Sequence, residues 1–262
     1  MLVILKMGGA AITDKATYET ANEEAIWKLA YAASQAYSLS KGKLQLIIVH
    51  GAGSFGHPQV VKYKVENGVR TPKQAYGYCR VRDSCSKLSA SVMRELLDAG
   101  VPAVLLPTGA IAIQKNKHIS HFHLDMINQA LKMGLVPVLR GDMVFDEAIG
   151  ASVCSGDHVI AYLCSKLKVD RAVFATDVDG VYTADPKTDK HARMFKEIKL
   201  SDLDRVKGAV SGAKTVDVTG GMKGKLAELK NINATVFVAN AKEPERITAL
   251  LLGKPALSTK IS

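Results

Sequence analysis

Segments rich in Val, Ile and Leu alternate along this chain with segments whose apolar residues recur at helical spacing. Strands of a parallel sheet show such short, nearly continuous apolar runs because helices cover both faces of the sheet. We expect these strands at 2–6, 44–50, 101–106, 135–139, 171–176 and 234–239, with a hairpin strand at 142–145. The alternation predicts an α/β protein with a mainly parallel central sheet.

Helical spacing predicts the segments that cover the sheet. The first helix follows Thr20 and Glu23, which have the spacing of a capping box. Its expected buried face consists of Ala25, Ile26, Leu29, Ala30 and Ala33. Further helices are expected at 73–99, 125–133, 157–166, 223–231 and 244–252. Because no repeat or low-complexity linker interrupts these elements, we expect one domain over 1–262 with two lobes, 1–165 and 166–262.

Composition excludes several classes of protein. The chain has 262 residues, of which 47% are hydrophobic and 23% charged, as in ordinary globular proteins. No apolar run reaches the roughly 18 residues that a membrane-spanning helix needs. The first residues lack a basic segment and a long apolar core, so we expect a cytoplasmic protein. The four cysteines match no metal-binding spacing, and we expect them in the core or in a pocket wall.

The charge balance favours an anionic partner. Against 25 Asp and Glu stand 35 Lys and Arg, a net charge of +10. The chain shows no zinc-finger or RNA-recognition signature, and aromatic residues make up only 6% of it, which leaves little material for stacking on bases. We therefore expect a small anionic molecule rather than a nucleic acid or a membrane.

Glycine-bearing turns follow four of the predicted strands, after Lys6, His50, Leu139 and Thr176. The carboxyl ends of parallel strands form one edge of the sheet, where ligands bind. The first turn, Lys6-Met7-Gly8-Gly9, continues to Lys15, and adjacent glycines between lysines suit a polyphosphate. The pattern is not a P-loop, and a simple glycine turn with solvated lysines is the alternative.

The second turn is His50-Gly51-Ala52-Gly53-Ser54-Phe55-Gly56-His57. Its three glycines predict a second nest of main-chain N–H groups, and its two histidines could donate to oxygens of a ligand. The alternative is that both histidines are structural. We hypothesise two neighbouring anion-binding turns, with His50 as a protonated donor.

Acidic residues follow in two further segments. Gly141-Asp142 and Ser155-Gly156-Asp157 could hold Mg²⁺ through water, orient lysines, or cap a helix. The segment 176–186 (TDVDGVYTADP) offers carboxylates and a tyrosine for a nucleoside, and 219–225 (TGGMKGK) adds a glycine pair before lysines.

These motifs together resemble the amino acid kinase superfamily. The similarity covers the chain from Lys6 to Lys225, and the combination of GGxxxTDK with HGAGSFGH is similar to the isopentenyl phosphate kinases within it. The resemblance implies an open αβα sandwich, usually a homodimer, with the acceptor in the N-terminal lobe and ATP mainly in the C-terminal lobe. It implies phosphorylation of isopentenyl phosphate with ATP and Mg²⁺, in isoprenoid biosynthesis by an alternative mevalonate route.

The resemblance also implies roles for residues at matching positions. Lys6, Gly8 and Gly9 would hold the β- and γ-phosphates, and Lys15 would stabilise the transferring phosphoryl group. The expected acceptor-binding residues are His50, Ala52, Gly53, His57, Gly156 and Asp157. The expected nucleotide-binding residues, besides the first turn, are Gly53, Asp177, Tyr182, Asp185, Gly221 and Lys225. No residue is assigned as a metal ligand, and His158 after Asp157 departs from the family pattern.

Two further expectations concern specificity. An apolar tail on the acceptor needs a pocket, for which the amphipathic stretch after 73 is the candidate. The expected wall residues are Tyr76, Cys79, Val81, Ser84, Cys85, Leu88 and Ile127. A fosfomycin-type phosphonate kinase, with a small polar pocket, and a non-catalytic nucleotide- or oxyanion-binding module remain as alternatives. His118, His121 and His123 could bind a transition metal or lie in a surface loop.

Overall fold

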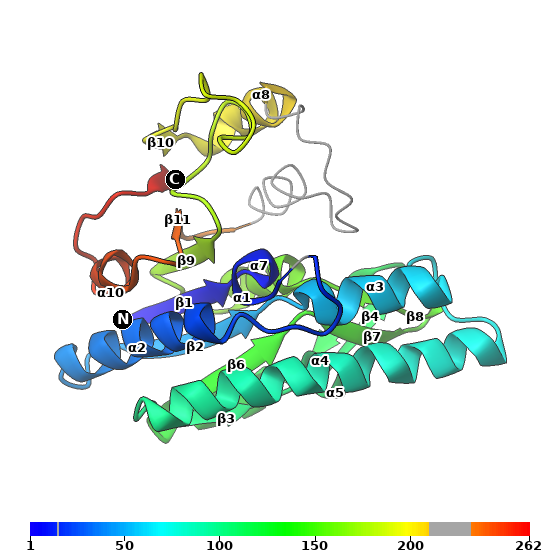
Figure 1. The fold of residues 1–262 in the computed structure, drawn as a ribbon. Coiled ribbons are helices and arrows are strands. Elements are labelled where there is room, and N and C mark those ends of the chain that lie inside the picture. The colour runs from blue at the N-terminus through cyan, green and yellow to red at the C-terminus, as the bar shows by residue number, and fades with distance from the viewer. Residues whose placement is uncertain (15, 210–231) are drawn as a thin grey trace.

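A computed structural model, which describes residues 1–14, 16–209 and 232–262, is organised around an eight-stranded sheet (Figure 1). Its strands are β1 (Leu2–Met7), β2 (Gln45–His50), β3 (Ala103–Leu105), β6 (Val136–Arg140), β9 (Arg171–Thr176), β10 (Glu197–Ile198), β11 (Thr235–Asn240) and β12 (Thr259–Ile261). Their order across the sheet is β10-β12-β11-β9-β1-β2-β6-β3. Only the β11–β12 pair is antiparallel within this sheet as described, which confirms the prediction of a mainly parallel sheet.

Helices cover both faces of this sheet, as the predicted αβα sandwich requires. On one face pack α2 (Glu23–Leu39), α4 (Pro72–Asp98) and α10 (Pro244–Leu251). On the other pack α6 (Leu124–Lys132), α7 (Gly156–Lys166) and α8 (Leu203–Ala209). Alternate residues of β1 serve the two cores: Val3 and Leu5 face α2 and α4, whereas Ile4 faces α7.

A smaller sheet stands beside the end of the large one. Its order is β5-β4-β7-β8, formed by β4 (Ala112–Lys115), β5 (His118–Phe122), β7 (Asp142–Asp146) and β8 (Gly150–Cys154). Of these strands only the first part of β7 was expected. The β4–β5 turn carries Asn116 and Lys117 at positive φ instead of glycine or proline, so it lacks the usual turn signal. Asp146 accepts hydrogen bonds from both of their N–H groups (3.0 and 2.7 Å).

Two local predictions need correction, and a third is not tested. The first helix begins at Glu23 and is capped by the Asn22 side chain, which accepts from Ala25 N–H at 3.1 Å. The Thr20 hydroxyl instead donates to the Tyr18 carbonyl oxygen, so no capping box forms there. The second glycine-bearing turn is shorter than expected, because α3 (Gly53–Tyr63) begins within it. The helix expected at 223–231 lies outside the described residues.

The sheet is continuous across the expected lobe boundary near residue 165. Strand β1 pairs with β2 on one side and with β9 on the other. The short helices α1 (Gly9–Ile12) and α5 (Thr108–Ile111) follow β1 and β3.

Within the described part of the chain, no helix combines the length and the apolar character that crossing a membrane demands. Cys85, Cys154 and Cys164 are buried as expected, whereas Cys79 is exposed.

Candidate active site

The turns after β9, β1, β2 and β6 meet at one edge because these four parallel strands are neighbours in the sheet. Cross-strand pairing sets Met7 beside both Ala175 and His50, and His50 beside Arg140. The Gly141 N–H donates to the His50 carbonyl oxygen at 2.9 Å, which joins the turn after β6 to the turn after β2. The prediction that the glycine-bearing turns share one edge is confirmed.

The turns after β1 and β2 touch each other through their main chains. A Cβ added at Gly9 would lie 2.6 Å from Gly53 N, and one added at Gly51 would lie 2.5 Å from Gly9 N. Side-chain carbons do not approach main-chain nitrogen this closely. Glycine is therefore required here because two turns are in contact, not only because each turn is tight.

Main-chain donors gather where these turns meet. The Gly51 N–H donates to Met7 O at 2.9 Å, and the Ser54 N–H donates to Thr13 Oγ1 at 3.1 Å. Among the described residues, nothing accepts a hydrogen bond from the N–H of Ala52 or Gly53, at the start of α3. Exposed N–H groups at a helix start bind anions.

Lys6 and Asp157 form a buried ion pair beside these donors. The Lys6 ammonium donates to Asp157 Oδ1, and the Phe174 ring centroid lies 5.2 Å from Lys6 Nζ. Ser155 caps α7 by accepting from the His158 N–H at 3.1 Å, so Asp157 lies in the first helical turn. The helix cap and the lysine-orienting carboxylate were alternatives in the sequence; the structure contains both, one at Ser155 and the other at Asp157.

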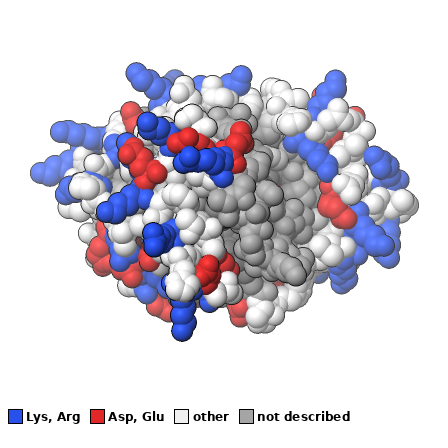
Figure 2. Space-filling view, turned by 90° about the horizontal axis from the view of Figure 1, so that it is seen from above, with Lys and Arg blue, Asp and Glu red and all other residues white. Residues whose placement is uncertain are grey.

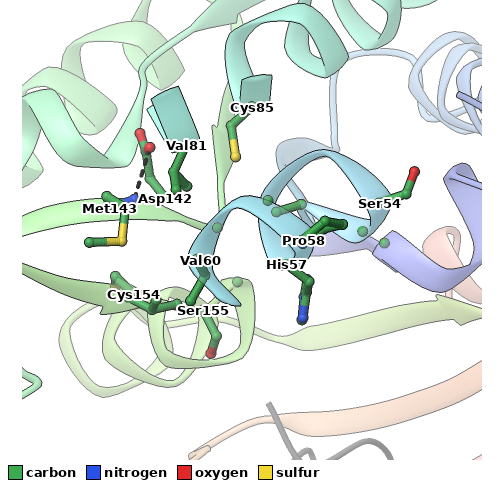
Figure 3. A pocket seen from close by; sticks show the side chains of 18 of the residues that line it. Ser54, His57, Pro58, Val60, Val81, Cys85, Asp142, Met143, Cys154 and Ser155 are labelled. Carbon is green, nitrogen blue, oxygen red and sulfur yellow. Dashed lines mark hydrogen bonds between the residues drawn. The ribbon is translucent and has the colours of Figure 1, made fainter. Parts of the chain in front are cut away.

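A cavity of about 560 Å³ extends from these groups between α3, α4 and the β7–β8 hairpin (Figure 3). Its polar lining consists of main-chain groups and polar side chains of Lys6, Gly9, Ala10, Gly51, Ala52, Gly53, Ser54, Gly56, His57, Lys62, Gly141, Asp142, Ser155, Gly156 and Asp157. Its apolar lining consists of Pro58, Val60, Val61, Val81, Cys85, Met143, Val153 and Cys154. Burial raises the pKa of the Cys85 thiol to about 12, so the thiol is neutral and contributes to the apolar wall. The cavity suits a ligand with an anionic head and an apolar tail.

The two histidines of the second turn have different environments. His57 lines the cavity, and its ring extends toward the open space beside α3 (Figure 3). His50 is fully buried and does not line the cavity. Burial lowers the pKa of His50 to about 4, so the expectation that this ring is protonated is wrong. His50 shares a face of β2 with Leu46 and Ile48, which pack toward α4, and this period of two was the signal that the sequence offered.

The expected apolar pocket is only partly correct. Val81 and Cys85 line the cavity, as predicted. Tyr76 and Cys79 are exposed, whereas Leu88 and Ile127 belong to the two cores on either side of the large sheet. Ser84 is buried and donates to the Phe55 carbonyl oxygen at 2.5 Å. The wall residues that were missed come from α3 and the β7–β8 hairpin: Val60, Val61, Met143, Val153 and Cys154.

The residues expected to bind nucleotide follow β9, next to the first turn. Gly8 N–H donates to the Ala175 carbonyl oxygen at 2.9 Å, which places Gly8 beside the end of β9. Asp177 accepts from Lys187 Nζ at 2.6 Å, and Asp185 accepts from the Lys187 N–H at 2.9 Å. Burial and the Asp179 charge raise the pKa of Tyr182. Lys15, Gly221 and Lys225 lie outside the described residues, so their roles stay predictions.

Neither the histidines of 118–123 nor the surface charges form a second site among the described residues. His118 and His121 lie in β5, and the rings of His121 and His123 meet edge to face at 4.6 Å. The described residues contain no group of three or more potential ligands arranged to hold a metal ion. On the face shown in Figure 2, Lys and Arg side chains stand among Asp and Glu rather than in a single basic patch.

The fold and these motifs match a known family. A family-wide sequence profile, described as the amino acid kinase family, matches residues 1–238. The chain belongs to this family. An isopentenyl phosphate kinase of Methanothermobacter thermautotrophicus is 36% identical over 273 aligned residues, which cover 100% of this chain and 99% of the relative. One of Methanocaldococcus jannaschii is 31% identical and covers 97% of this chain and 96% of the relative.

Solved structures of this amino acid kinase branch agree with the fold. A structure described as an X-ray structure of isopentenyl phosphate kinase superposes with a TM-score of 0.84 at 32% identity, over 100% of both chains. The Thermoplasma acidophilum isopentenyl phosphate kinase product complex gives a TM-score of 0.78 at 27% identity, also over 100% of both chains.

Proposed function

We propose that this amino acid kinase family member transfers the γ-phosphoryl group of ATP to isopentenyl phosphate, giving isopentenyl diphosphate and ADP. The observation that carries the proposal is the cavity with main-chain donors and Lys6 at one end and Val60, Val81 and Met143 at the other. A phosphate monoester with a short hydrocarbon tail satisfies both ends. The relatives named isopentenyl phosphate kinase support this substrate.

The proposed reaction needs little chemistry from the protein beyond position and charge. The second pKa of a phosphate monoester is near 6, so at pH 7 the acceptor already carries an anionic oxygen. That oxygen attacks the γ-phosphorus, and the bond from the γ-phosphorus to the bridging oxygen breaks as ADP leaves. Catalysis then rests on holding both phosphates in line and neutralising their charge.

We assign the acceptor phosphate to the N–H groups of Ala52 and Gly53 and to the His57 ring. Gly156 lies close to both the second turn and Lys6: a Cβ added at Gly156 would lie 3.6 Å from the His50 carbonyl oxygen and 3.8 Å from Lys6 Cε. Lys6 stands between this turn and β9 and would contact the transferring phosphoryl group, with Asp157 orienting its ammonium. Compared with His50, His57 is favoured as the side-chain donor because it lines the cavity.

We assign the nucleotide to the turn of Gly8 and Gly9 and to the segment after β9. Asp177, Tyr182 and Asp185 are assigned to the nucleotide as predicted from the sequence. Gly221 and Lys225, predicted for the same role, and Lys15, predicted to stabilise the transferring phosphoryl group, lie outside the described residues. The contact of Gly9 with Gly53 brings the two phosphate-binding turns together, as direct transfer requires.

The described residues fit a magnesium ion that is carried by ATP. The two carboxylates that line the cavity, Asp142 and Asp157, are bound to Arg140 and Lys6. Mg²⁺ commonly keeps several waters and binds mainly to substrate phosphates. When bound, the ion would neutralise charge on the β- and γ-phosphates.

A substrate panel tests the proposal. Isopentenyl, dimethylallyl and geranyl phosphates, fosfomycin and UMP would each be incubated with ATP and Mg²⁺, and phosphorylated product would be measured. We expect the highest kcat/KM with isopentenyl phosphate. Faster turnover of fosfomycin or UMP, or no ADP release with any acceptor, would overturn the proposal. The apolar wall argues against a fosfomycin-type kinase, which would need a small polar pocket.

We also propose that the protein is a cytoplasmic homodimer, as the family resemblance suggests. Light scattering of the purified protein tests the dimer, with twice the 28.1 kDa chain mass expected. Cell fractionation tests the location, with the protein expected in the soluble fraction.

A further inference from the structure

His50 does not serve the cavity through its ring, yet it stands directly before the acceptor-binding turn. Its side chain is fully buried on the α4 side of the sheet. Lys6 extends toward the opposite side, where it meets Phe174. A contact between the His50 ring and the acceptor phosphate is therefore absent from the described arrangement, and the ring needs another explanation.

The ring contacts fix which nitrogen carries the proton. His50 Nδ1 lies 3.0 Å from the Gly51 carbonyl oxygen, and a carbonyl oxygen can only accept, so Nδ1 is the donor. Nε2 lies 3.0 Å from Ser89 Oγ. In the neutral ring Nε2 is an acceptor, and the Ser89 hydroxyl is its donor. The same hydroxyl lies 3.0 Å from the Cys85 carbonyl oxygen, so it can turn between two acceptors.

A buried ion pair holds this arrangement from behind. Arg140 donates through one terminal nitrogen to Ser89 Oγ and through Nε to Asp142 Oδ2, each at 3.0 Å. Asp142 also accepts from the N–H groups of Gly109 and Met143, at 3.1 and 3.0 Å. The side chains that form these hydrogen bonds are nearly or fully buried, so water competes little for the bonds; they are His50, Ser89, Arg140 and Asp142. The ring of His50 is therefore held in one orientation.

The orientation of the ring decides the orientation of a peptide group. A trans peptide is planar, and its carbonyl and N–H point in opposite directions. The bond from His50 Nδ1 draws the Gly51 carbonyl oxygen toward the buried side of the turn. The N–H of the same peptide belongs to Ala52 and points the other way. Gly51 and Ala52 both line the cavity.

We propose that His50 is a positioning residue that aims the Ala52 N–H at the acceptor phosphate by holding the Gly51 carbonyl. Ser89, Arg140 and Asp142 keep its ring in place. The inference rests on the proposed function only in that an acceptor phosphate occupies this turn. It assigns to His50 an indirect role, through a peptide plane, in place of the direct contact expected from sequence.

Two conservative variants separate the indirect role from direct contact. In His50→Asn the side-chain nitrogen occupies the place of Nδ1, so the bond to the Gly51 carbonyl can persist. In His50→Gln the nitrogen occupies the place of Nε2, so a direct contact through that atom would persist instead. His50→Leu removes both. Ser86→Ala is the matched control, because Ser86 accepts from the same arginine at 3.1 Å but does not touch His50.

Binding and turnover are measured separately. We expect isothermal titration calorimetry with isopentenyl phosphate, and with inorganic phosphate, to give a Kd at least tenfold weaker for His50→Leu and His50→Gln. His50→Asn and Ser86→Ala should stay within threefold of wild type. In steady state the acceptor KM should rise with the Kd, while the KM for ATP changes less than twofold. If His50 served only stability, the variants would lower the thermal midpoint without weakening acceptor binding more than ATP binding.

Ser89→Ala tests the same claim without a change in the strand, and we expect about threefold weaker binding. Retention of binding by His50→Gln together with its loss in His50→Asn would overturn the inference, as would equal binding by all three His50 variants and wild type. If wild type binds inorganic phosphate with this dependence on His50 but does not turn over isopentenyl phosphate, the proposed function fails and the positioning role stands.

Discussion

The two ends of the cavity are built by different means. The phosphate end is made mostly by main chain, where Gly9, Gly51 and Gly53 touch and no side chain could fit between them. The apolar end is made by side chains from α3, α4 and the small sheet, such as Val60, Val81 and Met143. At the first end the absence of a Cβ is the requirement, whereas at the second only volume and polarity matter. We therefore expect substitutions at the first end to abolish chemistry and those at the second to change selectivity.

The largest effect is expected from Gly51→Ala. Its Cβ would lie 2.5 Å from Gly9 N, so the two turns must separate by about 1 Å, and main-chain donors move with them. We expect kcat/KM to fall by more than about 10³-fold, because misplacement by an ångström already costs about 10²-fold. Gly100→Ala is the control: an added Cβ at Gly100 would meet nothing within 4 Å, so only the positive φ of this residue opposes the substitution, which should cost about 1 kcal/mol of stability. Near-normal kinetics of Gly51→Ala would break the comparison.

Lys6→Met should come next. The variant keeps the length of the side chain but removes the ammonium beside Asp157, and we expect kcat to fall about 10²–10³-fold with a smaller change in acceptor KM. Lys62→Met at the cavity mouth is the control and should change kcat less than about threefold, because the Lys62 ammonium lies over the Tyr63 ring, 5.5 Å from its centroid. Comparable losses in the two variants would mean that general positive charge, rather than position, matters.

Val81→Ala probes the apolar end. Removing two methyl carbons widens the cavity, and we expect the kcat/KM ratio of geranyl to isopentenyl phosphate to rise about tenfold, within the range of 1–3 kcal/mol that a methylene is worth in a pocket. Val92→Ala lies on the same helix but in the core against the large sheet, so it should lower stability by about 2 kcal/mol and leave the ratio unchanged. An unchanged ratio in Val81→Ala would show that other residues set tail length.

The smallest effect on activity is expected at Asp146, which joins two turns of the small sheet behind the apolar end. Hydrogen bonds from main-chain N–H groups, among them that of Lys117, and from the Ser152 hydroxyl lower the pKa of Asp146 to about 2 although its burial acts to raise it. Because the folded-state pKa lies below the ordinary 3.8, the stabilisation is full above about pH 4 and is lost as the pH falls toward 2.

Asp146→Ala should therefore lower the free energy of unfolding by about 3 kcal/mol at pH 7. Thermal melts would show the difference from wild type shrinking as the pH falls from about 4 toward 2. Activity measured at 25 °C and pH 7 should change less than about threefold. A difference that is independent of pH would contradict the role of the carboxylate charge.

The contrast between the main-chain phosphate end and the side-chain apolar end also explains which parts of the molecule the sequence could predict. Strands of the large sheet and the edge that they share follow from apolar runs ending in glycine, and β9 was predicted without error at 171–176. The glycines at the phosphate end were found for the same reason. The β4–β5 hairpin was missed because lysine, at Lys117, stands where the usual Asn-Gly turn has glycine, so Asn116 alone gave only a weak turn signal. β10 and β12 were missed because both are short, with two and three residues, so neither gives an apolar run that could be recognised in the sequence.

The apolar wall was harder to predict because it is assembled from elements distant in sequence. Val81 on α4 and Val153 on β8 meet only in the fold. Helical spacing placed Leu88 and Val81 on the same predicted face, although Leu88 packs in the core and Val81 lines the cavity. The burial of the His50 ring was not predicted for a different reason: a histidine beside glycines suggests a ligand contact, whereas alternation along β2 already directs its ring toward α4.

The helix α3 takes part in both ends of the cavity. Its first turns carry Gly53 and His57, and Val60 follows one turn later, about 4.5 Å farther along the axis. Pro58 removes one main-chain hydrogen bond inside α3, but one helix still carries both sets of groups. A hydrocarbon that presses on Val60 therefore also shifts the groups that align the nucleophile. An acceptor of the wrong length would then dock normally yet react slowly, so discrimination would show in the rate of turnover more than in affinity.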